Sequence, residues 1–391
     1  MKTNGNSEII LTHIDLCICI GGLCEAITAI NVSALQSNYK TWPLLYQLLL
    51  IIPHKCKKFR WSLLVKLFLN LATAIMLYTS STPNDVDEYG FKRNEQFDYK
   101  SYELFMSSYL KTLAKRRIKW ERILQENIDL TTITAKLKRY IRKGIPGPYR
   151  PNVWMQISGA YKLQQRSPGL YNSLLRETNH EKEISDSISI DLPRTFPDNI
   201  FFDSKKERLY NILVAYAHHN REVGYCQGLN YIAGLLLLVT DDEEKSFWLL
   251  KHMIENIAPQ YHTKNMANLL RDMAVFKELI IRRIPAVNKH IEKLGLPYAV
   301  IASKWFICIF AEVLPAETII FRAALNMFLT HKTAILACDD IGALANFFRE
   351  TLIHDDIVTN CHTFLQSMFN LRLKRNELEG LRKICVGRNN T

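Results

Sequence analysis

The feature that most constrains the fold of this chain is a helical spacing of its apolar residues. Apolar side chains recur three and four positions apart in segment after segment, and this spacing places them on one face of an α-helix. Few segments alternate strictly between apolar and polar residues, and no glycine-rich strand-to-helix turn occurs. The pattern predicts an all-α fold class with helices over residues 102–125, 132–143, 209–217, 229–239, 246–257, 268–283, 301–313, 319–329 and 361–371.

Composition divides the chain near residue 84. The first part is an irregular, partly hydrophobic extension, in which Trp61–Tyr78 approaches the length that spans a bilayer. Lys66 and Asn70 raise the cost of inserting this segment. A membrane-surface or core-packed helix is therefore favoured over a transmembrane one. The predicted organisation is an N-terminal extension (1–84), a helical lead-in (85–131), a helical domain (132–373) and a C-terminal tail (374–391).

The formal net charge of +12 favours an acidic partner, such as an anionic membrane surface, an acidic protein or a nucleic acid. The densest basic run of the domain is "KLKRYIRK", residues 136–143, whose simplest interpretation is a solvated helix face. No clustered basic and aromatic surface motif accompanies it, which argues against nucleic acid.

The nine cysteines include no Cys-x-x-Cys pair, which indicates a reducing compartment rather than a disulfide framework. Cys17, Cys19 and Cys24 lie near His13, but their spacing fits no common zinc site. No metal is therefore predicted.

Two short stretches carry residues suited to chemistry. In "ISIDLPR", residues 188–194, the arginine lies between Pro193 and Pro197, which predicts a stiffened loop rather than a helix interior. The simplest interpretation of Arg194 is a surface arginine paired with Asp191.

The second stretch, "GYCQGLNYIAGLLLLV", places Gln227 directly before a very apolar run. Gly224 and Gly228 allow tight turns or a close backbone approach, and Asn230 can hydrogen-bond locally. The simplest interpretation of Gln227 is a helix-start residue that satisfies free backbone N–H groups. A thiol enzyme built on Cys226 and the nearby histidines is an alternative, although the spacing matches no thiol-protease signature.

Together with "GIPGPYRPNVW", residues 144–154, these stretches resemble the TBC domain, a family of GTPase-activating proteins for Rab-type small GTPases. The resemblance extends over residues 87–373. The third stretch is itself predicted to be a rigid loop before Trp154. The residues that match the family motifs or flank them are Ile188, Asp191, Arg194, Tyr225, Gln227, Gly228 and Arg150.

The resemblance implies a multi-helix Rab-GAP domain that supplies an arginine finger, Arg194, and a glutamine finger, Gln227, to the GTPase in trans. Gln227 would position the attacking water, and Arg194 would neutralise the charge that develops on the phosphates. Asp191 would orient the arginine loop, while Tyr225 and Gly228 would shape the glutamine turn.

The implied partner is a Rab GTPase in its GTP-bound form, acting in vesicle trafficking. The chain would then be an activator rather than a hydrolase. It would need no cofactor of its own, because GTP and Mg²⁺ are bound to the partner. The implied localisation is cytoplasmic, peripheral at endomembranes.

One departure from the family pattern follows "LPAET", residues 314–318. The family continues there with a further helix, whereas Thr318 leads directly into a sequence like that of the next helix. Losing a helix would expose apolar surface on the order of several hundred Å², and at about 25 cal/mol per Å² this exceeds the stability of a typical domain if nothing compensates. The alternative function is a catalytically inactive Rab-binding or scaffold protein.

Overall fold

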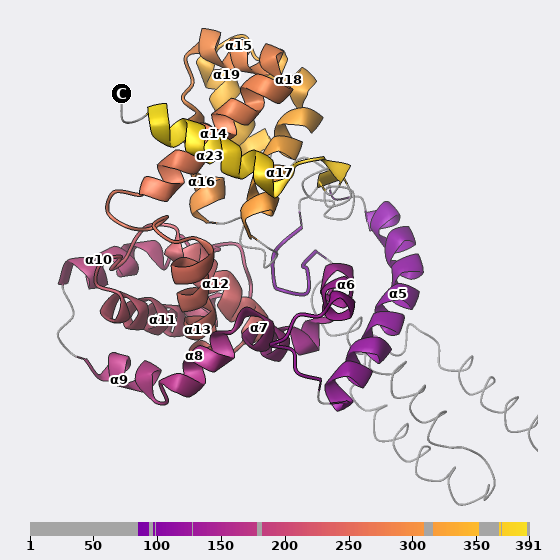
Figure 1. Ribbon diagram of the computed structural model, residues 1–391, viewed down its shortest axis with the longest axis vertical. Coiled ribbons are helices and arrows are strands. Elements are labelled where there is room, and N and C mark those ends of the chain that lie inside the picture. Colours follow the sequence, from indigo (N-terminus) through magenta and orange to yellow (C-terminus); the bar gives the residue numbers. More distant parts are fainter. Residues whose placement is uncertain are drawn as a thin grey trace, which may run out of the picture. The chain divides into compact units, whose positions relative to one another are not determined.

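The computed structural model describes residues 85–93, 97, 99–126, 128–177, 182–308, 316–351, 367–368 and 370–388. These residues are mainly helical and include no strand, only isolated bridges that pair Val86 with Lys92 and Phe91 with Asn199 (Figure 1). The all-α prediction is confirmed. The predicted N-terminal extension, with its hydrophobic segment and its cysteine group, lies outside the described residues.

The helices follow the predicted periodicity closely. Every segment predicted between residues 102 and 329 overlaps a helix, and most of the segment 361–371 lies outside the described residues. The α-helices are α5 (Tyr99–Gln125), α6 (Ala135–Lys143), α7 (Arg150–Ser158), α8 (Ala160–Arg166), α9 (Leu170–Arg176), α10 (Lys182–Asp191), α11 (Lys206–His219), α12 (Leu229–Thr240), α13 (Glu243–His252), α14 (Ala267–Arg283), α15 (Pro285–Leu294), α16 (Tyr298–Ile307), α17 (Ala316–Thr330), α18 (Lys332–Leu336), α19 (Ile341–Asn346) and α23 (Arg375–Arg388). Shorter segments are η3 (Gly147–Tyr149), η4 (Asp203–Lys205), η5 (Met253–Ile257) and η7 (Phe347–Thr351).

The main core forms around α12, which packs against α11 and α13. Helix α12 is apolar on nearly all sides, as expected for a helix surrounded by others. The next helix has conventional end signals. The Asp242 side chain accepts a hydrogen bond from the Lys245 N–H at the start of α13, and Glu243 and Glu244 follow in its first turn.

A second, smaller core joins α5, α6 and α7. Its buried residues are Trp120, Ile123, Leu130, Leu137, Ile145 and Val153. The Trp120 Nε1–H donates to the Gly144 carbonyl oxygen at 3.1 Å, which ties α5 to the end of α6. Gly144 has a φ of 102° and ends α6, as the sequence predicts. Trp154 packs against both cores, so α7 connects the α5–α6 pair to the main core.

The C-terminal helix α23 packs against α14. Its Leu378 and Leu381 are buried, and the Arg382 guanidinium donates to both Asp272 carboxylate oxygens at 2.8 and 2.6 Å. Asp272 is itself fully buried and accepts a further hydrogen bond from the Tyr261 hydroxyl. Residues that the sequence assigns to a tail therefore contribute to the core.

The predicted loop before Trp154 is confined to residues 144–146. The 3₁₀ segment η3 is followed directly by α7, which begins at Arg150, so Trp154 lies inside a helix. The prolines do not prevent this, because Pro148 and Pro151 occupy the first positions of these segments, where no intrahelical N–H bond is lost.

The junction at Thr318 lies within one continuous helix, α17. The absence of a family helix at this point stays a prediction. Among the described residues, no helix combines the length and the apolar character needed to cross a membrane.

Candidate functional site

The first predicted site residue, Arg194, lies in a turn that follows α10. The helix ends at Asp191, so Ile188 and Asp191 belong to its last turns, and the predicted loop begins only after them. The Arg194 guanidinium forms an ion pair with the Asp191 carboxylate. The arginine side chain is 51% exposed and the aspartate side chain only 3%. A buried carboxylate thus holds a guanidinium at the surface.

The second predicted site residue, Gln227, lies in a turn at the start of α12. Gly224 and Gly228 bound this turn with φ angles of 57° and 105°, which L side chains rarely adopt. The φ of Gly228 favours glycine, and a Cβ atom there would also make a tight contact of 3.2 Å with the Ile307 side chain.

The Gln227 side chain is exposed, and within the described part of the chain its amide forms no hydrogen bond. The interpretation of Gln227 as a helix-start residue that caps α12 is therefore wrong. Gly228 is the N-cap residue, and its N–H donates to the Asn230 side-chain oxygen at 3.1 Å. The amide of Gln227 is left available to a partner.

Two hydrogen-bonded links join the arginine turn to the glutamine turn. In one, the Tyr225 hydroxyl donates to the Asp191 carboxylate at 2.5 Å. In the other, the Asn230 amide donates to the Thr195 hydroxyl at 2.7 Å, and that hydroxyl donates to the Asp191 carbonyl oxygen at 2.7 Å. The links contact residues on both sides of Gln227 in the sequence. The two turns are consequently held against each other.

The electrostatics of the first link favour a fixed arrangement. Burial raises the pKa of the Tyr225 phenol, and the hydrogen bond to Asp191 and the charge of that carboxylate raise it further. The phenol therefore stays protonated and keeps donating to Asp191 at physiological pH. The carboxylate in turn remains between two donors, the phenol and the guanidinium.

Further residues support the turns from outside the sequence motifs. The Tyr231 hydroxyl donates to the Arg194 carbonyl oxygen at 3.3 Å, and the Lys304 ammonium lies 5.2 Å from the centre of the Tyr231 ring. Sequence reasoning missed Tyr231 and Thr195 as supports. The only indication of these roles in the sequence was proximity to the fingers: Tyr231 lies one helical turn after Gln227, and Thr195 directly follows Arg194.

The remaining predicted residues have different surroundings. Ile188 is fully buried in the main core. Arg150 donates to the Ile145 carbonyl oxygen at 2.9 Å, pairs with Glu88 at 3.5 Å and lies 5.7 Å from the centre of the Tyr89 ring. Among the described residues, none of these contacts of Arg150 involves either turn.

The surroundings of Cys226 do not favour a thiol enzyme. Burial raises the pKa of the Cys226 thiol, which disfavours the reactive thiolate. His218 contacts the Leu174 carbonyl oxygen at 3.0 Å, and His219 contacts the Lys251 ammonium at 2.6 Å, so both rings have partners other than the thiol. Across the described ranges, no three His, Cys, Asp or Glu side chains gather as metal ligands would.

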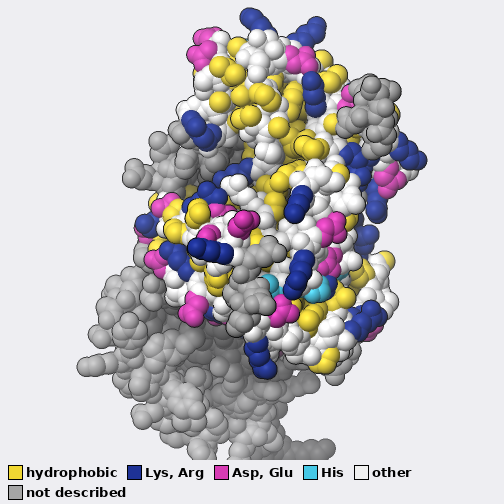
Figure 2. Space-filling view, turned by 90° about the vertical axis from the view of Figure 1, so that its left-hand side faces the viewer, with side chains coloured by type: hydrophobic (Ala, Val, Ile, Leu, Met, Phe, Trp, Pro, Cys, Tyr) yellow, Lys and Arg dark blue, Asp and Glu magenta, His cyan; other side chains and the backbone are white. Residues whose placement is uncertain are grey.

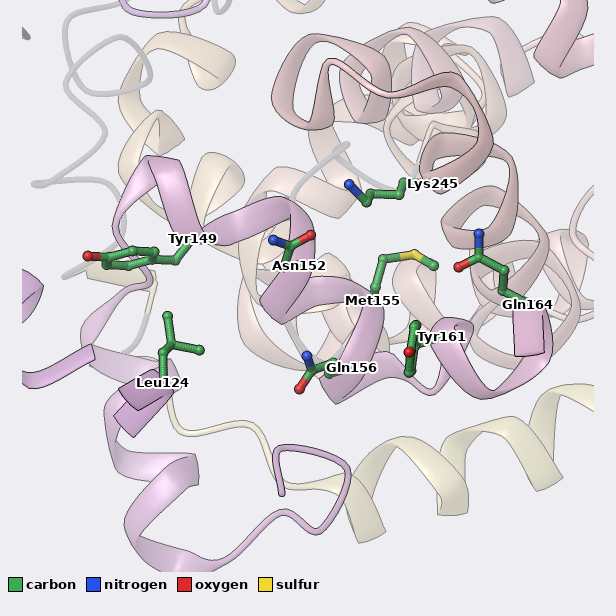
Figure 3. A pocket seen from close by; sticks show the side chains of 8 residues that line it. All are labelled: Leu124, Tyr149, Asn152, Met155, Gln156, Tyr161, Gln164 and Lys245. Carbon is green, nitrogen blue, oxygen red and sulfur yellow. The ribbon is translucent and has the colours of Figure 1, made fainter. Parts of the chain in front are cut away.

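A cavity of about 400 Å³ lies elsewhere in the domain, between the end of α5, α7, α8 and α13 (Figure 3). It is lined by Leu124, Tyr149, Asn152, Met155, Gln156, Tyr161, Gln164 and Lys245. Its charged lining residue, Lys245, pairs with Asp242 at 3.0 Å. None of its lining residues is a predicted site residue, so the cavity is not part of the candidate site.

These features define a class of protein: an all-α scaffold that presents an exposed guanidinium and an exposed amide on two joined turns. Comparison with known proteins places the chain within that class. Residues 148–350 match the family described as the Rab-GTPase-TBC domain, and the chain belongs to this family.

Relatives and solved structures agree with this assignment. The chain is 43% identical to growth hormone-regulated TBC protein 1-A of Danio rerio, over 73% of this chain and 85% of the relative. It is 41% identical to growth hormone-regulated TBC protein 1 of Homo sapiens, over 73% and 89%. The crystal structure of the Chlamydomonas flagellar RabGAP TBC domain matches with a TM-score of 0.57 and 26% identity, over 73% of this chain and all of that one. The Ypt/Rab-GAP domain of Gyp1p, at 20% identity and a TM-score of 0.55 over 66% and 97%, shows the fold alone.

The family resemblance inferred from the motifs is thereby confirmed. Family membership supports a Rab GTPase-activating function and implies a Rab GTPase as the partner.

Proposed function

We propose that this chain accelerates GTP hydrolysis by a Rab GTPase through two side chains, Arg194 and Gln227, that it supplies to the nucleotide site of the partner. The observation that carries the proposal is the pair of hydrogen-bonded links between the two turns. Because the links fix the turns relative to each other, a single approach of the GTPase delivers both side chains.

Arg194 is the proposed source of positive charge. Phosphoryl transfer depends mainly on positioning and on electrostatic stabilisation of charge on the phosphate oxygens. A guanidinium has five N–H donors in a fixed fork, and the ion pair with Asp191 leaves the others for phosphate oxygens. An arginine supplied in trans is worth roughly 10³–10⁵ in rate, or about 4–7 kcal/mol.

Gln227 is the proposed positioning group for the attacking water. A side-chain amide both donates and accepts hydrogen bonds, so it can hold a water molecule in line with the phosphorus. A carboxylate at this position would repel the phosphates. The N-terminus of α12 follows directly after Gln227, and its partial positive charge adds to the attraction for phosphate oxygens.

The proposed partner state is the GTP-bound Rab, because the fingers act on a γ-phosphate. GTP and Mg²⁺ belong to the partner, so the proposal assigns this chain no cofactor of its own. The net charge of +12 favours approach to a GTPase on an anionic, endomembrane surface.

The test is a single-turnover GTP hydrolysis assay against a panel of purified Rab proteins loaded with GTP. The wild-type chain is expected to accelerate hydrolysis by at least one of them, and Arg194→Lys and Gln227→Ala are expected each to reduce that acceleration strongly. Unchanged stimulated rates in both variants would refute the finger roles.

Binding to a GTP-loaded Rab without any acceleration by the wild-type chain would favour the alternative, a catalytically inactive Rab-binding or scaffold protein. A binding assay on the same panel distinguishes this outcome from a complete failure to recognise the Rab proteins tested.

A further inference from the structure

Two helices outside the candidate site carry an unusual share of the basic side chains. Helix α5 has seven Lys or Arg residues and two Glu, and α6 has five Lys or Arg residues and no acidic residue. The whole chain has a net charge of +12. The positive charge of the protein is thus concentrated on this pair of helices.

On α5, basic and apolar side chains share one exposed face. Leu104, Lys111, Lys115, Ile118 and Arg122 are spaced by seven, four, three and four positions, which aligns them along one side of a helix. All five are exposed, with Leu104 at 65% and Ile118 at 51%. The two glutamates of the helix lie about a quarter circle away from this stripe.

On α6, the basic residues occupy the side that faces away from the small core. Leu137 is buried and Tyr140 and Ile141 are half-buried, which fixes the inward side of the helix. The remaining positions form an arc of about half the helix circumference. This arc contains the exposed residues Lys136, Lys138, Arg139, Arg142 and Lys143.

Two further exposed apolar residues lie in the segment between the helices, Ile128 at 39% and Ile133 at 50%. We call the α5 stripe, the α6 arc and these two isoleucines the α5–α6 surface. It rests on the small core through Trp120 and Leu137, so its shape does not depend on the arginine turn or the glutamine turn, which we call the finger turns.

The basic residues of the α5–α6 surface form no ion pair with any residue that the structure describes. Elsewhere in the domain some basic residues have acidic partners, as Lys251 has Glu255 and Arg382 has Asp272, and others, such as the exposed Lys289 and Lys293, have none among the described residues. Figure 2 shows one face of the molecule on which basic and acidic side chains are interspersed. What sets the α5–α6 surface apart is the number of unpaired cations that it groups together, which gives it a positive potential.

We propose that the α5–α6 surface binds the anionic surface of a lipid bilayer. Its cations would lie at the level of the headgroups, where each Lys or Arg near the surface strengthens binding by about fivefold. Leu104 and Ile118, placed among those cations, would enter the boundary between headgroups and acyl chains.

The exposed aliphatic residues favour lipid over nucleic acid. A nucleic-acid surface pairs its cations with aromatic stacking platforms or with polar groups that contact phosphates. The α5 stripe instead exposes a leucine and an isoleucine, which gain free energy by leaving water only if the partner is apolar. A bilayer offers negative charge and apolar depth together.

The test is sedimentation of the full chain with lipid vesicles. Vesicles of phosphatidylcholine containing about one-third phosphatidylserine are compared with vesicles of phosphatidylcholine alone, at low and at high salt. The wild-type chain is expected to bind the anionic vesicles more tightly, and salt is expected to weaken this binding. The N-terminal extension is present in every variant, so its contribution cancels in the comparison.

The decisive variant combines Lys111→Glu, Lys115→Glu and Arg122→Glu. Its affinity for anionic vesicles is expected to fall by about 100-fold or more, because three surface cations are lost. Leu104→Ser with Ile118→Ser is a second variant, expected to lower affinity by about tenfold while the salt dependence remains. The matched control combines Lys289→Glu, Lys293→Glu and Lys332→Glu on α15 and α18, and should change affinity by less than about threefold.

Equal loss of binding in the control would show that overall charge, not this surface, governs binding, and would overturn the proposal. So would unchanged binding in the α5 variant, or preferential binding of the wild-type chain to duplex RNA or DNA over anionic vesicles. The stimulated GTP hydrolysis rate in solution, measured in parallel, reports separately on the finger proposal, which this surface does not require.

Discussion

The two finger turns and the α5–α6 surface use positive charge in opposite ways. Arg194 is held by a buried carboxylate and lies in a turn that is hydrogen-bonded to its neighbour. The cations of the α5–α6 surface have no acidic partner among the described residues and project from helices that pack on the small core through their opposite sides.

This difference indicates two kinds of recognition. A guanidinium that must meet one oxygen of one phosphate gains from being held in place, because misplacement by about 1 Å can cost 10²-fold in rate. Cations that meet a fluid anionic surface need no fixed geometry, since their contributions add through charge alone. The ion pair with Asp191 therefore distinguishes Arg194 from the unpaired cations of the α5–α6 surface.

The largest expected effect is that a variant in either region impairs one activity and spares the other. Arg194→Ala is expected to reduce the stimulated hydrolysis rate by about 10³-fold or more and to leave vesicle binding unchanged. The α5 triple variant is expected to do the reverse. Single-turnover hydrolysis and vesicle sedimentation measure the two. Arg221→Ala, which removes another exposed arginine, is the control and should preserve both activities.

Gly228→Ala should damage the glutamine turn. The φ of 105° and a Cβ only 3.2 Å from Ile307 predict a loss of about 2–3 kcal/mol in the free energy of unfolding. The stimulated rate should fall as well, because Gln227 precedes the strained residue. Gly380→Ala on α23, where an added Cβ meets nothing within 4 Å, is the matched control and should be neutral or stabilising in urea unfolding. Equal losses in the two variants would contradict the account.

The stability of the region that supports Gly228 should depend on pH through His262. Its Nε2 contacts the Ile307 carbonyl oxygen at 2.8 Å, and burial lowers its pKa from 6.5 to about 4. The unfolded state therefore binds the proton more readily, and stability falls as the pH drops below 6.5.

Between pH 7.5 and pH 5 this effect should remove about 2 kcal/mol from the free energy of unfolding. Urea unfolding at several pH values measures it, and His262→Gln should lack this component. Parallel pH profiles for wild type and His262→Gln would exclude the assignment.

The smallest expected effect comes from Tyr225→Phe, which removes one of the two links between the turns. Loss of a hydrogen bond to a charged acceptor should cost about 1.5 kcal/mol of stability. The stimulated rate should fall more than stability alone explains, because the turns become less fixed. Tyr210→Phe is the matched control. It removes a hydroxyl contact between Tyr210 on α11 and Ser185 on α10, the helix that also carries Asp191, and it should leave the rate unchanged. A normal rate in Tyr225→Phe would show that the second link alone suffices.

The helical spacing of apolar residues and the short motifs predicted much of the fold. The features that they did not predict depend mainly on tertiary contacts. The periodicity of α6 and α12 identified both helices, and the motifs singled out Arg194 and Gln227. The start of α7 at Arg150 was missed. Prolines were taken to indicate a loop, but proline is also tolerated in the first turn of a helix.

The links between the turns could not be predicted from sequence. Thr195 and Asn230 are separated by 35 positions, and neither residue type indicates the other. The contact between Gly228 and Ile307 is likewise created only when α12 and α16 pack in three dimensions. The missing family helix near Thr318 and the roles of the site residues stay predictions.

The most direct test of the central claim is a crystal structure of this chain bound to a responsive Rab protein that carries GDP, Mg²⁺ and aluminium fluoride in place of the transferred phosphate. The account predicts that the Arg194 guanidinium and the Gln227 amide both lie within hydrogen-bond distance, about 3 Å, of the fluoride or of the water in line with it. A complex in which either side chain points away from the nucleotide, with the GTPase supplying that group itself, would contradict it.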